Sequence, residues 1–185
     1  MVRMLVDSAA DFLTEELNEK KIFMVPLTIT VDDKDSYRDE MDLTRDELFR
    51  LMIEEGKSVK TSQPSPQSFV EVFEQVKAAG DELVCLMLSS TLSGTYRSAM
   101  LAKDIVDYDK IYIVDTLSAT IAIKLMVDHA LDLIAQGKSG EEIAKVMEEM
   151  KGKTRIMAGI DTLKYLYLGG RVSRTTAIVA DAVNI

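Results

Sequence analysis

Short runs of apolar residues alternate along most of the chain with longer segments in which apolar positions recur every three or four residues. Strands are predicted by the apolar runs 2–6, 22–31, 83–88 and 110–114. Helices are predicted by the periodic segments 10–20, 66–80, 95–104, 119–136 and 140–150. This alternation favours an α/β fold, a three-layer α/β/α arrangement around a parallel sheet, which we place in residues 1–152.

Individual residues set several of the predicted boundaries. Thr44 followed by Glu47 forms a capping box, which predicts a helix that starts after Thr44. Ser65 is a favourable N-cap residue, and Pro66 suits the first position of a helix. Pro26 lies inside the run 22–31 and predicts a sheet edge or a bend there, because proline cannot donate to a strand ladder.

Three turns follow predicted strands. They contain Asp7-Ser8, Ser89–Ser93 and Asp115-Thr116. In parallel sheets ligands bind outside the carboxyl ends of the strands. We therefore expect these turns to meet at one edge of the sheet.

The remainder of the chain, residues 153–185, predicts a strand at 155–160 and a short helix at 162–168 that stops at Gly169-Gly170. These are 33 residues (185 − 152), fewer than the ~50 that an independent domain needs.

Charge and cysteine content narrow the class of protein. The 185 residues include 31 acidic and 22 basic ones, a net charge of −9, which argues against binding to nucleic acid or to anionic lipid surfaces. No run reaches the ~18 apolar residues of a membrane span. The single cysteine, Cys85, cannot form an internal disulfide and predicts a reducing, cytoplasmic location.

Common catalytic and metal sites are not supported. The only histidine, His129, falls inside a predicted helix, so serine hydrolysis lacks a base. Gly137-Lys138-Ser139 has Asp132 where a phosphate-binding loop needs its first glycine. One cysteine and one histidine cannot build a zinc site, and the cluster 32–35 predicts an exposed acidic turn. We expect no catalytic residue, no metal and no cofactor.

Three segments are richer in hydroxyl groups, glycine and arginine than folding requires. They are Thr61–Pro66, Leu88–Tyr96 and Gly169–Ser173. A carboxylate only accepts hydrogen bonds, and these segments supply hydroxyl, backbone N–H and guanidinium donors. The same residues also fit a plainer interpretation, in which the serines cap helices, the prolines interrupt a loop and Arg171 is a surface charge.

At these segments the chain resembles the DegV family of bacterial fatty-acid-binding proteins. The matching residues are Asp7–Asp11, Val25–Thr28, Thr61–Pro66, Leu88–Ser90, Leu92–Tyr96, Asp115-Thr116, Tyr165-Leu166, Gly169–Ser173 and Asn184-Ile185. Their order and spacing agree along the whole chain. Ala9 stands where the family usually has threonine, which removes one hydroxyl from the first loop.

The resemblance implies a ligand and a second α/β domain with a mixed sheet, of which residues 153–185 would be the incomplete beginning. DegV-like proteins bind one long-chain fatty acid with its tail in an apolar tunnel between two domains. Carried over to this chain, the carboxylate is held by Thr61 and Ser93, with Ser62 and the Gly94 N–H as helpers. By the same resemblance, Arg171 lies near the head group and is implicated in the interaction with a kinase partner. That fatty acid kinase forms an acyl phosphate, and the binding protein presents the substrate without being an enzyme.

Two alternatives remain open from the residues. One is a hydrolase or an acyl- or phosphoryl-transfer enzyme with Ser93 as nucleophile, and the other is a binder of another small carboxylate or phosphate. DegV-like chains continue past the Asn184-Ile185 motif. If this chain ends there, we expect weak lipid binding, with partial disorder or burial against another copy at 177–185. Fatty acid chain length, unsaturation and oligomeric state are left open.

Overall fold

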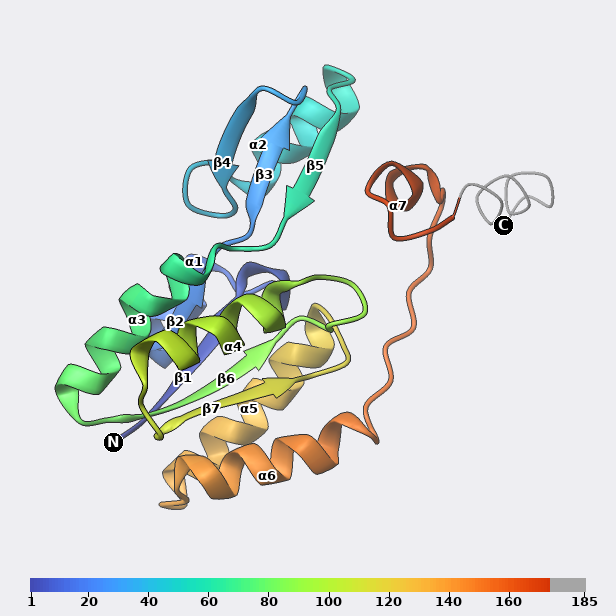
Figure 1. The fold of residues 1–185 in the computed structure, drawn as a ribbon. Coiled ribbons are helices and arrows are strands. Elements are labelled where there is room, and N and C mark those ends of the chain that lie inside the picture. Colours follow the sequence, from blue (N-terminus) through green and yellow to red (C-terminus); the bar gives the residue numbers. More distant parts are fainter. Residues whose placement is uncertain (174–185) are drawn as a thin grey trace.

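A four-stranded parallel sheet forms the centre of the computed structural model, which describes residues 1–173 (Figure 1). Its strands are β1 (Val2–Asp7), β2 (Ile22–Val25), β6 (Glu82–Met87) and β7 (Ile111–Asp115). They lie in the order β2-β1-β6-β7, and each neighbouring pair is parallel. The predicted parallel sheet is therefore confirmed.

Helices cover both faces of this sheet and complete the three predicted layers. One face carries α1 (Thr14–Lys20), α5 (Ile121–Ala135) and α6 (Gly140–Lys151). The other face carries α3 (Pro66–Ala79) and α4 (Thr95–Val106). Alternate residues of a strand point to opposite faces, so Met4 and Val6 pack on the first set of helices and Leu5 on the second.

A second, smaller sheet stands beyond the carboxyl ends of the parallel strands (Figure 1). It contains β3 (Thr28–Val31), β4 (Asp35–Arg38) and β5 (Val59–Ser62), which are antiparallel in the order β4-β3-β5. Helix α2 (Arg45–Phe49) and a π-helical turn (Arg50–Glu54) precede β5. The buried side chains of this region are Ile29, Val31 and Leu43.

Local boundary signals have mixed outcomes. The Thr44–Glu47 capping box and the Ser65 cap with Pro66 at the first helical position are confirmed. Pro26 does separate two strands, and they belong to different sheets. The helix predicted at 10–20 begins only at Thr14, because Asp7 caps a short 3₁₀ turn (Ser8–Ala10) that Asp11 ends with a φ of 64°.

The last part of the described chain contains one wrong prediction. Residues 155–160 form no strand, since a strand needs a neighbour for its N–H and C=O groups and the described sheets place none beside them. The short helix is confirmed as α7 (Lys164–Leu168), with Gly169 as its C-cap, and Figure 1 shows it away from the parallel sheet. Asn184-Ile185 and the expectation for 177–185 lie outside the described residues. The boundary after residue 152 stays a prediction.

Candidate functional site

The carboxyl ends of the parallel strands meet, as their order predicts, and hydrogen bonds join the turns that follow them. Asp7 Oδ2 at the end of β1 accepts from the Leu88 N–H at 2.7 Å. Asp115 Oδ1 at the end of β7 accepts from the Ser90 N–H at 3.0 Å. Two aspartates therefore hold the turn after β6 from either side.

Asp7 is fully buried, and its environment changes its acidity. Burial raises the pKa of Asp7 to about 6, because the charged form loses its hydration. The N–H groups of Leu88 and Ala9 lower the pKa in part, and the nearby charge of Asp39 raises it. Burial also raises the pKa of Asp39, which is half-buried. The joint between the two sheets thus contains two carboxyl groups that gain a proton more readily than free aspartate.

Backbone and side-chain contacts at the same joint connect the small sheet to the large one. The Leu27 N–H donates to Ser8 Oγ at 3.0 Å, and Leu27 O accepts from the Asp39 N–H at 3.0 Å. Arg45 of α2 makes ion pairs with Asp11 at 2.7 Å and with Glu40. A cleft of about 550 Å³ lies here, and its lining is formed by Ser8, Ala9, Asp11, Asp39, Glu40, Arg45, Leu48, Phe49 and Thr120.

The loop from Leu88 to Thr95 is organised by its own hydroxyl groups. Ser93 Oγ and Thr95 Oγ1 share a hydrogen bond of 2.8 Å, and the Thr95 N–H donates to Ser93 Oγ at 3.3 Å. Gly94 is the N-cap of α4 and gives that helix no side-chain cap. The first turn of a helix has N–H groups without intrahelical partners, so this helix start offers donors to an anion.

Thr61 and Ser62 end the strand β5, where they face Ile29 and Thr28 of β3 across the ladder. Both residues are exposed, and neither hydroxyl forms a hydrogen bond within residues 1–173. Both hydroxyls are therefore available to a ligand.

Gln63 brings this segment to the loop before α4. Its Nε2 donates to Ser98 Oγ of α4 at 3.0 Å. Its carboxamide also lies so close to Gly94 that a Cβ added to Gly94 would overlap Oε1 and Cδ of Gln63. The segment Thr61–Gln63 and the loop Leu88–Thr95 are therefore in contact.

Arg171 reaches the same loop from the end of α7. Its Nε donates to Leu92 O at 3.1 Å, and its Nη1 donates to Gly169 O at 2.6 Å. Gly170 has a φ of 77°, a left-handed conformation that favours glycine and turns the chain back at this point. The structure thus brings all three segments singled out in the sequence to one loop, Leu88–Thr95.

The sequence does not reveal the contact that Gln63 makes with Gly94 and Ser98. Gln63 lies within the segment that we expected to bind, yet nothing in the sequence showed where its side chain goes. Ser98 carried no signal at all, because a serine inside an amphipathic helix is unremarkable. The only available hint was the position of Gln63 directly after two candidate hydroxyls.

Other groups that often form sites lie elsewhere. His129 is exposed on α5, and Cys85 is fully buried in β6, where burial raises the pKa of its thiol. Within residues 1–173 no group of three or more potential metal ligands gathers, and no helix is long and apolar enough to cross a membrane.

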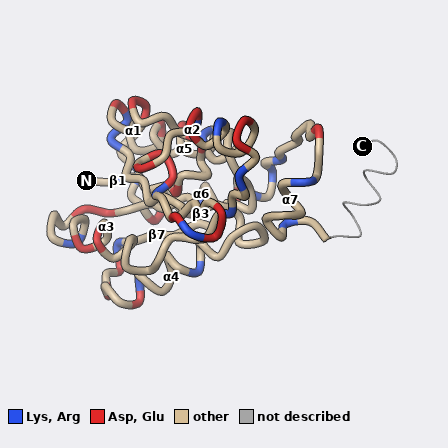
Figure 2. The backbone as a smooth tube through the Cα atoms, turned by 90° about the horizontal axis from the view of Figure 1, so that it is seen from above, with Lys and Arg blue, Asp and Glu red and all other residues tan. Residues whose placement is uncertain are grey.

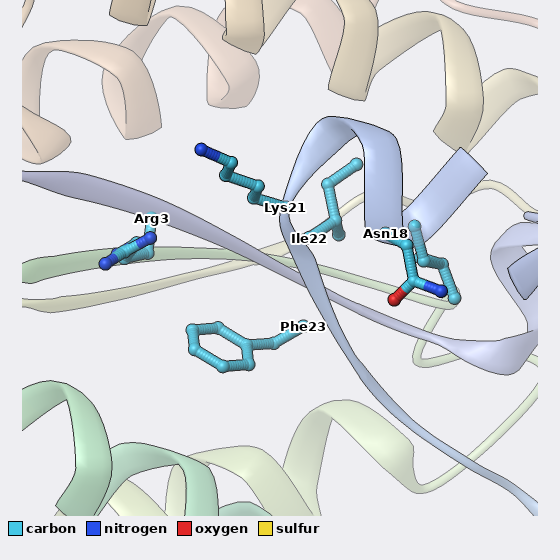
Figure 3. A pocket seen from close by; sticks show the side chains of 6 residues that line it. Arg3, Asn18, Lys21, Ile22 and Phe23 are labelled. Carbon is cyan, nitrogen blue, oxygen red and sulfur yellow. The ribbon is translucent and has the colours of Figure 1, made fainter. Parts of the chain in front are cut away.

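A pocket of about 360 Å³ lies at the opposite end of the parallel sheet (Figure 3). Arg3 and Phe23, near the amino ends of β1 and β2, form part of its lining together with Lys21. Arg3 is paired with Asp81 at 3.0 Å. This hollow is remote from the turns at the carboxyl ends of the strands, so we do not assign it to the candidate site.

Charged residues of both signs are interspersed along the described chain (Figure 2). Several form ion pairs on the small sheet, including Lys60–Asp33, Lys57–Asp32 and Arg38–Asp42. Pairs of this kind offset one another's charge, whereas Arg171 brings a guanidinium group to the hydroxyl-rich loop through its hydrogen bond to Leu92 O.

Known proteins resemble this chain along its whole length. A family model described as "Uncharacterised protein, DegV family" matches residues 1–185. A DegV domain-containing protein of Caldanaerobacter subterraneus subsp. tengcongensis is 37% identical over 184 residues, which cover 100% of this chain and 65% of that protein.

Solved structures show the same fold. One is the structure of a fatty-acid-binding DegV family protein from Thermus thermophilus. It is 29% identical to this chain with a TM-score of 0.85, and the match covers 97% of this chain and 63% of that one. A stearic-acid-binding protein from Eubacterium ventriosum is 31% identical with a TM-score of 0.82, over 95% of this chain and 61% of that one. This chain spans less than two thirds of these relatives' lengths, and it belongs to the DegV family.

Proposed function

We propose that this protein binds a long-chain fatty acid. In this proposal Thr61, Ser62, Ser93, the Gly94 N–H and Arg171 hold the carboxylate. The observation that carries the proposal is the convergence on one loop, where Gln63 lies against Gly94 and Arg171 donates to Leu92 O. Fatty acid binding by the solved relatives from Thermus thermophilus and Eubacterium ventriosum supports the same ligand.

The chemistry of the converging groups suits a carboxylate. A carboxylate accepts hydrogen bonds and cannot donate them, so it is matched by hydroxyl, N–H and guanidinium donors. The acyl chain contributes ~0.8 kcal/mol for each CH₂ removed from water, and the buried head group then needs such donors. The hydroxyls of Thr61 and Ser62, which form no hydrogen bond within residues 1–173, and the Gly94 N–H at the start of α4 supply them.

We also propose that a separate kinase acts on the bound fatty acid. The kinase would transfer the γ-phosphoryl group of ATP to a carboxylate oxygen, giving an acyl phosphate and ADP. A site built mainly from neutral hydroxyls suits both head groups, because the acyl phosphate also accepts hydrogen bonds. The need for ATP would place this exchange in the cytoplasm.

The first test is the ligand that accompanies the protein. Mass spectrometry of the denatured protein, purified from bacteria, should detect a long-chain fatty acid. A different small carboxylate or a phosphate compound would contradict the proposed ligand. Turnover of an ester or a phosphate compound without a partner, lost in Ser93→Ala, would instead show an enzyme. The hydrogen bonds of Ser93 Oγ within residues 1–173 are both with Thr95, and neither partner is a base.

The second test addresses the residues that hold the head group. The double variant Thr61→Ala with Ser93→Ala should weaken fatty acid binding at least tenfold, since two hydrogen bonds to a charged group are lost. Ser36→Ala is the matched control, because Ser36 is an exposed hydroxyl on β4, the opposite edge of the small sheet from Thr61. Unchanged affinity in the double variant would contradict the proposed clamp.

A further inference from the structure

We propose that Gln63 is a positioning residue that fixes the two hydroxyl segments of the site relative to each other. The inference rests on the proposed fatty acid site, and it concerns a residue that does not itself hold the ligand. Thr61 and Ser62 belong to the small antiparallel sheet, whereas Ser93 and Gly94 belong to the loop after the parallel strand β6. Gln63 spans the gap between these two units.

One end of Gln63 is anchored by its own chain. Gln63 follows Ser62, the last residue of β5, and precedes Pro64, which is buried. A residue before proline is restricted to extended conformations, so the direction of the Gln63 side chain is limited from the start. Gln63 is therefore tied through the backbone directly to Ser62 and Thr61.

The other end of Gln63 is anchored on α4. Ser98, which accepts the hydrogen bond from Gln63 Nε2 at 3.0 Å, is only 1% exposed. A buried hydroxyl without a hydrogen-bond partner is unfavourable. The Gln63 carboxamide is therefore favoured in the position from which it donates to Ser98. Gln63 itself is exposed as a residue, and the contact is made by its terminal carboxamide.

Gly94 provides the space for this contact. Its backbone has φ −78° and ψ 4°, which other residue types also adopt, so backbone conformation does not require glycine here. The space does: a Cβ at position 94 would overlap Oε1 and Cδ of Gln63 and lie 3.0 Å from its Nε2. The absent side chain of Gly94 and the carboxamide of Gln63 form an interlock directly beside Ser93.

Fatty acid affinity and loop protection together test the interlock in the full chain. Affinity for palmitate is measured by calorimetry, and amide hydrogen exchange is measured for residues 89–97. We expect Gln63→Ala to weaken binding by about five- to tenfold, as for one hydrogen bond, and to speed exchange in the loop but not in β1. Gln67→Ala, an exposed glutamine on α3, is the matched control and should change neither.

The decisive comparison is a double variant. Gly94→Ala alone should weaken binding at least as much as Gln63→Ala, because the new methyl group displaces the carboxamide. In the Gln63→Ala background the methyl group has room and alanine keeps the backbone N–H, so Gly94→Ala should add much less to the loss than it causes alone. An equal loss in both backgrounds would overturn the proposal, since Gly94 would then be needed for some other reason.

The outcomes also separate this inference from the proposed function. If the wild-type chain binds palmitate and Gln63→Ala binds equally well with an unchanged loop, Gln63 has no positioning role although the function stands. If the wild-type chain binds no fatty acid, the proposed function fails. The interlock is then judged by hydrogen exchange alone, where Gly94→Ala must loosen residues 89–97 only when Gln63 is present.

Discussion

The two sheets of this protein differ in how they are stabilised. The strands of the parallel sheet are covered by helices on both faces, and nearly all residues of β6 are buried. The strands β4 and β5 of the antiparallel sheet are largely exposed, and the core beneath them has three buried side chains, Ile29, Val31 and Leu43. The large sheet is thus a rigid base, and the small sheet carries Thr61 and Ser62 on a much thinner core.

The largest expected effect is a deletion in the base. Phe73 of α3 is fully buried against the parallel sheet, so Phe73→Ala should lower the free energy of unfolding by about 3–5 kcal/mol. Phe49 of α2 is 56% exposed and gives a control of the same size, for which we expect a much smaller change. Urea unfolding measures both. A loss below about 1 kcal/mol for Phe73→Ala would contradict the picture of a tightly packed base.

The next effect concerns pH at the joint between the sheets. The pKa of Asp7 is about 6 in the folded chain, above its value of about 4 when unfolded, so the folded state binds the proton more strongly between pH 4 and 6. Stability contributed by Asp7 is therefore present below pH 4 and is lost as pH rises through 6. The total change is about 3 kcal/mol.

Asp7→Asn isolates this contribution because asparagine does not titrate. The free energy of unfolding of the wild type minus that of Asp7→Asn should fall by about 3 kcal/mol between pH 3 and 7. Carboxyl groups with a lowered pKa, such as Asp42 and Glu142, are present in both proteins, so their contribution to the pH dependence cancels in this difference. Parallel pH profiles for the two proteins would show that Asp7 is not perturbed by its burial.

A smaller effect tests whether the small sheet opens separately. Ile29→Ala should destabilise the antiparallel sheet by about 2 kcal/mol, because one of its three buried side chains is lost. Hydrogen exchange should accelerate at Thr28–Val31 while the amides of β6 keep their protection. Equal acceleration in both sheets would contradict the comparison, since the two would then unfold as one unit.

The smallest effect compares two nearly identical helix caps. Thr44 and Ser139 each accept from the N–H of a glutamate three residues later at 3.3 Å, and both form capping boxes. Each change to alanine removes about 1 kcal/mol from its helix. Ser139→Ala, on α6 of the base, should lower the urea midpoint, whereas Thr44→Ala should mainly speed local exchange in α2. Equal shifts of the midpoint would remove the distinction between the two regions.

The sequence predicts the parallel sheet well because strands buried on both faces have a recognisable pattern of apolar residues. A strand covered on both faces needs apolar residues throughout, so 83–88 was recognisable as β6 without any knowledge of its neighbours. The strand β4 (Asp35–Arg38) has no such pattern, since the sequence of an exposed polar strand cannot be distinguished from that of a loop. Thr61 and Ser62 of β5 lie in a polar segment and are not recognisable as a strand for the same reason. The wrong strand at 155–160 shows the converse: apolar residues alone do not form a strand without a neighbour to pair with.

The candidate site was predictable in its parts and not in its connections. Hydroxyl, glycine and arginine residues stand out by type, and they indicated three segments of the site. That Arg171 donates to Leu92 O and that Gln63 reaches Ser98 depends on contacts between residues far apart in the sequence. Such pairings follow from the packing of whole elements, and no spacing in one chain encodes them.

The small sheet also has a consequence for protein engineering. Thr28 and Ser62 are paired across the β3–β5 ladder, so the chain leaves the base and returns to it at points about one strand spacing, ~5 Å, apart. Residues 28–62 can therefore be treated as a cassette whose two ends lie side by side. Exchanging this cassette for that of a relative would replace Thr61 and Ser62 by the relative's residues while the sequence of the parallel sheet is kept, and the ion pair of Arg45 with Asp11 is the contact to preserve.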